Sequence, residues 1–223
     1  MYVIALLSIS FMSTDIYSQF KFEKPSIPGL TGDKEQTESS GNPADAAAKL
    51  ESDLRSALVA VAKADELIKL AYGDKDGAAQ AAARADKLNN GGDVKGAIEE
   101  TKSSAEANAK LAEEQTDLDA ESKKKLAAAI PPYLKAIYKT TQLSKSMKDF
   151  ADEAKNALKE VRTNPMKLRK VQKSLSTGMM IAKNGPGLIK GLATNGKKLV
   201  TSAKSQGVEV DDDDVAVAYK ILR

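Results

Sequence analysis

The side chains that this 223-residue chain offers for catalysis are Asp, Glu, Lys, Tyr and Ser, because it contains no His and no Cys. A thiolate nucleophile, a His general base, a disulfide and a Cys/His zinc site are therefore excluded. The di-iron centres of helical bundles are excluded as well, since they depend on a Glu-x-x-His motif.

The carboxylates show no pattern typical of an acid–base pair. Glu99-Glu100 and Glu113-Glu114 are adjacent pairs, and neighbouring residues point in different directions on a helix, so the members of a pair cannot share a site. We see no Asp or Glu isolated within an apolar run, where burial would raise its pKa. We therefore expect a protein without enzymatic activity, cofactor or metal.

Four consecutive aspartates, Asp211 to Asp214, raise the question of a Ca²⁺ site. An EF-hand loop places its ligands at alternate positions, with Gly at the sixth and Glu at the twelfth, and this run does not fit. Acidic residues are favoured at the N-terminus of a helix, where they cap free amides and complement the helix dipole. The run predicts the cap of a short C-terminal helix, and contact with the basic part of the chain is an alternative.

Charge is divided unevenly along the chain. Residues 43–121 contain 10 Lys/Arg and 17 Asp/Glu, a net charge of −7, whereas residues 122–208 contain 19 and 4, a net charge of +15. Within the second part, residues 161–208 have ten basic side chains and no acidic one. The formal net charge of +3 for the whole chain hides this asymmetry, which limits what each part can lie against.

Three interpretations of the basic segment 161–208 stay open. Its lysines are solvated or face the acidic part of the chain; or residues 187–204 form an amphipathic helix on an anionic membrane or lipopolysaccharide; or the segment binds an anionic polymer such as a polysaccharide or nucleic acid. The membrane helix would lack the usual Trp or Phe, and nucleic acid is disfavoured because no recognition motif or aromatic stacking platform is present. For an external anionic partner, whether lipid or polysaccharide, we expect contact at Lys190, Lys197, Lys198 and Lys204.

The glycines of this segment form no phosphate loop. In a Walker loop a strand precedes the first glycine and Ser or Thr follows the lysine, whereas Gly191-x4-Gly196-Lys197 is followed by Lys198. We expect Gly191 and Gly196 to let a neighbouring helix approach closely or to mark a break in the helix.

Apolar residues recur every three to four positions through most of the chain after residue 42, which predicts amphipathic helices. Breaks are expected at Gly73, at Gly91-Gly92 and at the run Asn184-Gly185-Pro186-Gly187, and a break or sharp kink is expected near Ile130, before Pro131-Pro132. They divide residues 43–223 into about six or seven helices. Abundant alanine and only 4% aromatic residues favour closely packed helices over a sheet. The sequence therefore predicts an all-α, antiparallel multi-helix bundle.

The N-terminal residues predict export. The apolar run 3–12, followed by Ser18, is typical of a cleaved signal peptide over residues 1–18, although no Lys or Arg precedes it. A short buried N-terminal helix is the alternative. Residues 19–42 are rich in Pro, Gly and polar residues and predict a flexible leader. We expect a periplasmic or secreted protein with no transmembrane span after cleavage.

These observations favour a structural or interaction protein of the periplasm or cell surface, with another protein or an anionic surface as its partner. The alternative is a carrier or binder of an anionic amphipathic ligand that uses the basic C-terminal half. An interaction protein should have a filled core and an exposed apolar patch, whereas a lipid carrier needs an internal apolar cavity.

Overall fold

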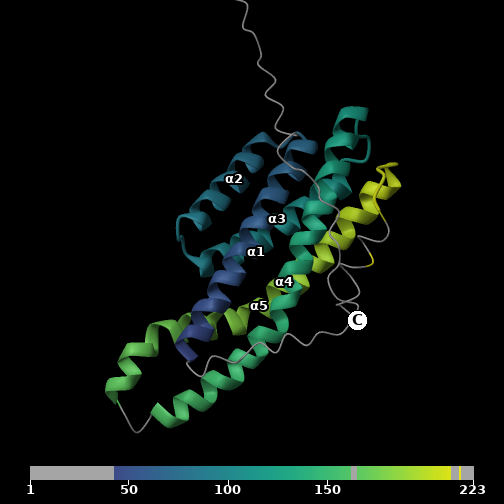
Figure 1. Ribbon diagram of the computed structural model, residues 1–223. Helices are drawn as coiled ribbons and strands as arrows, with labels where there is room; N and C mark the ends of the chain where they lie inside the picture. Colours follow the sequence, from purple (N-terminus) through teal and green to yellow (C-terminus); the bar gives the residue numbers. More distant parts are fainter. Residues whose placement is uncertain (1–42, 162–164, 212–215, 217–223) are drawn as a thin grey trace, which may run out of the picture. The chain divides into compact units, whose positions relative to one another are not determined.

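The computed structural model describes residues 43–161, 165–211 and 216, and within these ranges it contains five long α-helices and no strand. The helices are α1 (Pro43–Ala71), α2 (Lys75–Asn89), α3 (Val94–Glu114), α4 (Ala120–Val161) and α5 (Pro165–Ser205), shown in Figure 1. The all-α prediction is confirmed in the described residues, where the five helices differ slightly from the expected six or seven because two expected divisions, at Pro131-Pro132 and at residues 184–187, do not occur. The predicted signal peptide, the leader and most of the C-terminal helix lie outside the described residues.

The turns after α1 and α2 lie where glycine predicted them. Gly73 and Gly91 end α1 and α2 with φ values of 74° and 82°, a conformation that glycine adopts without steric cost. Asp74 then caps α2 by accepting a hydrogen bond from the Gly77 amide at 2.9 Å. Asp93 caps α3 in the same way, accepting from the Gly96 amide at 2.8 Å.

Of the break or sharp kink expected near Ile130, the break does not occur, because α4 continues through Pro131 and Pro132. Each proline lacks an amide hydrogen, so the carbonyls of Ala127 and Ala128 lose their partners within the helix. Ala128 is exposed and Ala127 is partly exposed, so water can reach these carbonyls. On the opposite side Ile130, Tyr133 and Leu134 are buried and hold the helix against the core. Tertiary packing therefore outweighs the local cost of the two prolines.

The turn expected at residues 184–187 is also wrong, because α5 remains helical through Pro186. Pro186 is exposed and leaves the carbonyl of the partly exposed Ala182 without a helical donor. Asn184 donates its side-chain amide to the carbonyl of Met180 at 3.0 Å, which satisfies another carbonyl of this stretch. Ile181 and Leu188 are buried on both sides of the proline, so the apolar face continues without interruption.

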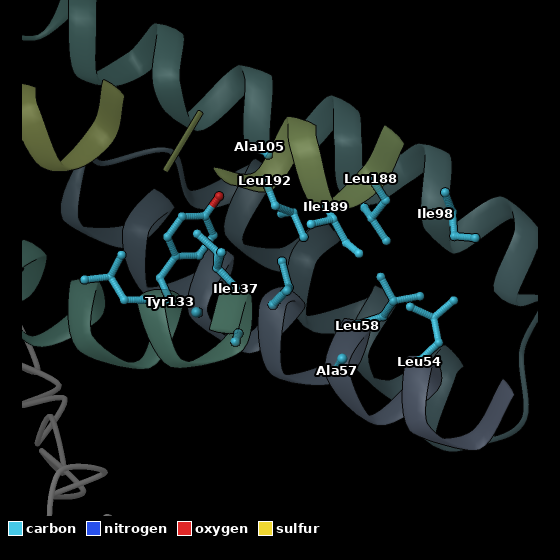
Figure 2. Packing of buried hydrophobic residues seen from close by; sticks show 14 of the residues in the cluster. Leu54, Ala57, Leu58, Ile98, Ala105, Tyr133, Ile137, Leu188, Ile189 and Leu192 are labelled. Carbon is cyan, nitrogen blue, oxygen red and sulfur yellow. The ribbon is translucent and has the colours of Figure 1, made fainter. Parts of the chain in front are cut away.

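The core lies around α1, which packs against each of the other four helices. Figure 2 shows Leu54 and Leu58 of α1, Ile137 of α4 and Leu188 of α5 within one cluster of buried residues. The helices α1 and α2 are antiparallel: Arg55 in the first half of α1 hydrogen-bonds the carbonyl of Gly92 after α2, and Asp65 further along α1 pairs with Arg84 earlier in α2. Asn108 of α3 donates to Asp65, which places α3 against α1 as well.

Two glycines of α5 that the sequence analysis did not single out for close packing allow a close approach of helices. A Cβ atom on Gly178 would overlap the Phe150 ring, and one on Gly185 would overlap Met147, both on α4. Around Gly191, by contrast, a Cβ atom would have no neighbour within 4 Å. The expectation that Gly191 serves close packing is therefore wrong. The contacts also show that α4 and α5 are antiparallel, since Phe150 lies beside Gly178 and the earlier Met147 lies beside the later Gly185.

Candidate functional site

Lysines line one side of α5 at a regular interval of seven residues. We call Lys183, Lys190, Lys197 and Lys204 the lysine row; all four are exposed. Seven residues are only about 20° short of two helical turns, so the four side chains leave the helix in nearly the same direction. With a rise of about 1.5 Å per residue, successive lysines are about 10.5 Å apart along the axis. The row is thus a nearly straight line of positive charge.

Lysines 190, 197, 198 and 204, predicted to contact an anion, divide between two settings. Lys190, Lys197 and Lys204 belong to the row, whereas Lys198 lies about 100° further round the helix. The ammonium group of Lys198 is 3.0 Å from the carboxylate of Glu113 on α3. For Lys183, Lys190 and Lys197 no carboxylate among the described residues lies within ion-pair distance. Although the apolar face of α5 packs against α1 and α3, the ion pair between Lys198 and Glu113 is the contact through which this set of lysines is seen to meet a carboxylate of the acidic part.

The apolar face of α5 is buried in the core of the protein. Leu188, Leu192 and Leu199 are at most 1% exposed, and Ile189 is 7% exposed. In Figure 2, Leu188, Ile189 and Leu192 point into the cluster that also contains Ile98 of α3 and Ile137 of α4. A helix that lies in a membrane interface needs such side chains on its outer face. In this fold they face the core, and the outer face of α5 carries lysine, threonine and glycine.

An open cavity of about 670 Å³ lies between α4 and α5. Met147, Ala151, Ala182 and Pro186 provide its apolar part, and Lys145 and Lys148 stand at its edge. The cavity opens to solvent, so it does not enclose an apolar chain as the interior of a lipid carrier would. Lys145 and Lys148 are both exposed and add positive charge to the α4 side of the helix pair.

A second group of charged residues lies inside the protein and was missed by the sequence reasoning. Asp65 of α1 is 0% exposed and accepts hydrogen bonds from Arg84 Nη2 of α2 at 2.5 Å and from Asn108 Nδ2 of α3 at 2.8 Å. Ser104 of α3 also hydrogen-bonds the carboxylate. We call Asp65, Arg84, Ser104 and Asn108 the Asp65 cluster. It joins three helices at one buried point.

Burial raises the pKa of the Asp65 carboxyl above its usual value of 3.8, while Arg84, Ser104 and Lys69 act in the opposite direction. The expectation that no carboxylate is buried in an apolar run is therefore wrong. The signal was present in the sequence, because Asp65 continues the spacing of Leu54, Leu58, Val61 and Ile68 on the apolar face of α1. Asn108 and Ser104 continue the corresponding face of α3.

The Asp65 cluster has the features of a structural element and offers nothing that a substrate could reach. Arg84 is 8% exposed, and its Nη1 atom donates to the carbonyl of Glu100 at 3.2 Å, so the guanidinium is engaged on α1 and α3 together. In the part of the chain that the structure describes, no three acidic residues are close enough to hold a metal ion. Of the aspartate run, Asp212 to Asp214 lie outside that part.

Five basic residues that precede Lys183 fall outside what the structure describes, namely Arg162 and the side chains of Lys167, Arg169, Lys170 and Lys173. None of the described helices has an apolar stretch long enough to cross a membrane. No known protein family matches the sequence, and no curated protein or solved structure is significantly similar to the chain.

Proposed function

We propose that this chain is an exported binding protein without catalytic activity, which contacts an anionic partner through the lysine row of α5. The observation that carries the proposal is the exposure of Lys183, Lys190 and Lys197 with no carboxylate beside them among the described residues. A line of unneutralised charge raises the local potential and attracts anions over distances of about a Debye length, roughly 8–10 Å at physiological salt.

An apolar docking patch is less well supported as the partner site. Leu70 of α1 and Tyr138 of α4 are the large apolar side chains exposed among the described residues, at 41% and 36%. Two partly exposed side chains are fewer than a contiguous apolar interface requires. Charge, rather than apolar area, is therefore the feature on which the binding proposal rests.

The proposal also makes the chain non-enzymatic. The exposed carboxylates stand on solvated helix faces or in ion pairs such as Lys198–Glu113, and the buried carboxylate of Asp65 is enclosed by its partners. A general acid or base must come within hydrogen-bond reach of its substrate. The enclosed carboxylate of Asp65 favours a structural role, and the solvated carboxylates favour a role at the surface.

Binding is tested with the full chain and two kinds of vesicle, one of phosphatidylcholine alone and one with added phosphatidylglycerol, together with an acidic polysaccharide immobilised on a sensor. We expect binding to at least one anionic probe at low salt, and a steep loss of affinity as salt rises. Affinity for neutral vesicles equal to that for every anionic probe would refute the proposal.

Export is tested separately, by the intact mass of the protein from its native source. Cleavage after Ser18 predicts a mature chain that has lost about 18 residues and is found outside the cytoplasm. A cytoplasmic protein that retains Met1 would contradict export and leave the anion-binding proposal standing.

A further inference from the structure

A second row of small residues runs along α5 beside the lysine row. Gly187, Thr194 and Thr201 are exposed and, like the lysines, follow one another at intervals of seven residues. Each stands four residues after a member of the lysine row, which places it about 40° further round the helix. The outer face of α5 thus combines a line of ammonium groups with a parallel line of glycine and hydroxyl groups.

On the side of this face that lies toward α3, carboxylates of α3 form ion pairs with lysines. Glu113 of α3 lies 3.0 Å from Lys198, and Glu99 of the same helix lies 3.0 Å from Lys102. These lysines reduce the repulsion that the two carboxylates would exert on an approaching anion. The lysine row itself has no such pairing at Lys183, Lys190 and Lys197 among the described residues.

A lipid bilayer fits this face poorly. Binding in the membrane interface requires apolar side chains that enter the acyl region, and those of α5, chiefly Leu188, Leu192 and Leu199, are buried in the core. Exposing them would forfeit most of the packing of α5. The helix has no Phe, Tyr or Trp, so it also lacks the surfaces on which nucleic-acid bases stack.

We propose that the outer face of α5 binds an acidic polysaccharide, an extended chain whose carboxylate or sulfate groups pair with the lysine row. This inference rests on the anion binding proposed above and names the class of partner. A linear polymer can place anionic groups beside Lys183, Lys190 and Lys197 at once, along about 21 Å of helix. Sugar hydroxyls can meanwhile exchange hydrogen bonds with Thr194 and Thr201, whose small side chains permit close approach.

The test compares three probes against the full chain: heparin as a sulfated polysaccharide, phosphatidylglycerol-containing vesicles, and single-stranded DNA. Two variants accompany the native protein. One replaces Lys183, Lys190 and Lys197 with Gln; the matched control replaces three exposed lysines of α1, α2 and α3, namely Lys63, Lys75 and Lys95, with Gln. Both variants lose the same net charge, so a difference between them reports position alone.

We expect heparin to bind most tightly at low salt, the row variant to weaken that binding about tenfold or more, and the control to change it by about threefold or less. Replacing Thr194 and Thr201 with Val should weaken it a further few fold. If vesicles or DNA bind more tightly than heparin, and the row variant abolishes that binding, the polysaccharide proposal is wrong and the anion-binding proposal stands. Absence of binding to all three probes, or equal losses in the row variant and the control, would overturn both.

Discussion

The Asp65 cluster and the lysine row use the same kinds of charged residue in opposite ways. Asp65 and Arg84 are almost fully buried and pair with one another across α1 and α2, and Asn108 and Ser104 of α3 hydrogen-bond the same carboxylate. Lys183, Lys190 and Lys197 are exposed, with no described carboxylate in ion-pair distance. Removing one partner of a buried pair leaves an uncompensated charge in the interior and destabilises the fold, whereas removing an exposed charge changes the stability little.

The difference teaches that the position of a charge relative to the apolar stripe of its helix decides what it does. Asp65 lies on the stripe of α1 and is drawn into the core with its neighbours. The lysine row lies off the stripe of α5 and stays in solvent. The first group should therefore govern folding and the second should govern binding.

The largest expected effect is on folding. Arg84→Met should lower the free energy of unfolding by about 3–5 kcal/mol, because Asp65 would remain buried without its counter-charge. Urea unfolding followed by circular dichroism at 222 nm measures this loss. The double variant Asp65→Leu with Arg84→Met should be less destabilised than the single variant, because it leaves no buried charge. Equal or greater destabilisation in the double variant would show that the pair contributes more than mutual neutralisation.

The next effect compares two glycines on the inner and outer sides of α5. Gly178→Ala should destabilise the protein by about 1–3 kcal/mol, since its Cβ atom would overlap the Phe150 ring. Gly191→Ala should stabilise it by about 0.5–1 kcal/mol, because the position is open and alanine favours the helix. Thermal unfolding of both variants would check this pair. A shift of the same sign in both would show that α5 does not approach α4 at Gly178 as described.

A smaller effect concerns pH, where two aspartates should act with opposite signs. The pKa of Asp65 is raised in the folded state, so its contribution to stability is present below about pH 3.8 and is lost as pH rises through the folded pKa. The pKa of Asp93 is lowered by hydrogen bonds from the Gly96 and Lys95 amides, so its contribution is present above about pH 3.8 and is lost as pH falls through the folded pKa.

Asp65→Asn and Asp93→Asn, each compared with the native chain from about pH 2 to pH 7, separate the two contributions. The stability of the native chain relative to Asp65→Asn should fall with rising pH, and relative to Asp93→Asn it should fall with falling pH. Differences that do not vary with pH would show that neither carboxyl changes its pKa on folding.

Local signals predicted the turns well because they depend on a few neighbouring residues. Gly73, Gly91 and the caps Asp74 and Asp93 act within one or two turns of chain, so their effect can be read from the sequence. Pro131 and Pro186 misled for the opposite reason, since whether a proline breaks a helix depends on what holds the helix from outside. The carbonyls freed by these prolines can reach water, and the buried face beside each one keeps the helix intact.

The lysine row could be found in the sequence, but its exposure could not. The absence of acidic residues from 161–208 and the seven-residue spacing are properties of the chain alone. Whether the lysines would meet the acidic helices depends on which face of α5 turns toward α3, and that is fixed by packing across the whole bundle. Lys198, adjacent to the row, does meet Glu113. The positions of Asp65, Ser104 and Asn108 on the apolar faces of their helices could be found in the sequence, but their meeting with Arg84 depends on how three helices pack.

The most direct test of this account measures folding and binding together in the variant that replaces Lys183, Lys190 and Lys197 with Gln. If the row faces a partner, the free energy of unfolding should stay within about 0.5 kcal/mol of the native value, because exposed charges contribute little to stability. Affinity for the anionic probe should fall about tenfold or more in the same preparation. A loss of several kcal/mol in stability, or unchanged affinity with an intact fold, would contradict the separation of the two groups of charge.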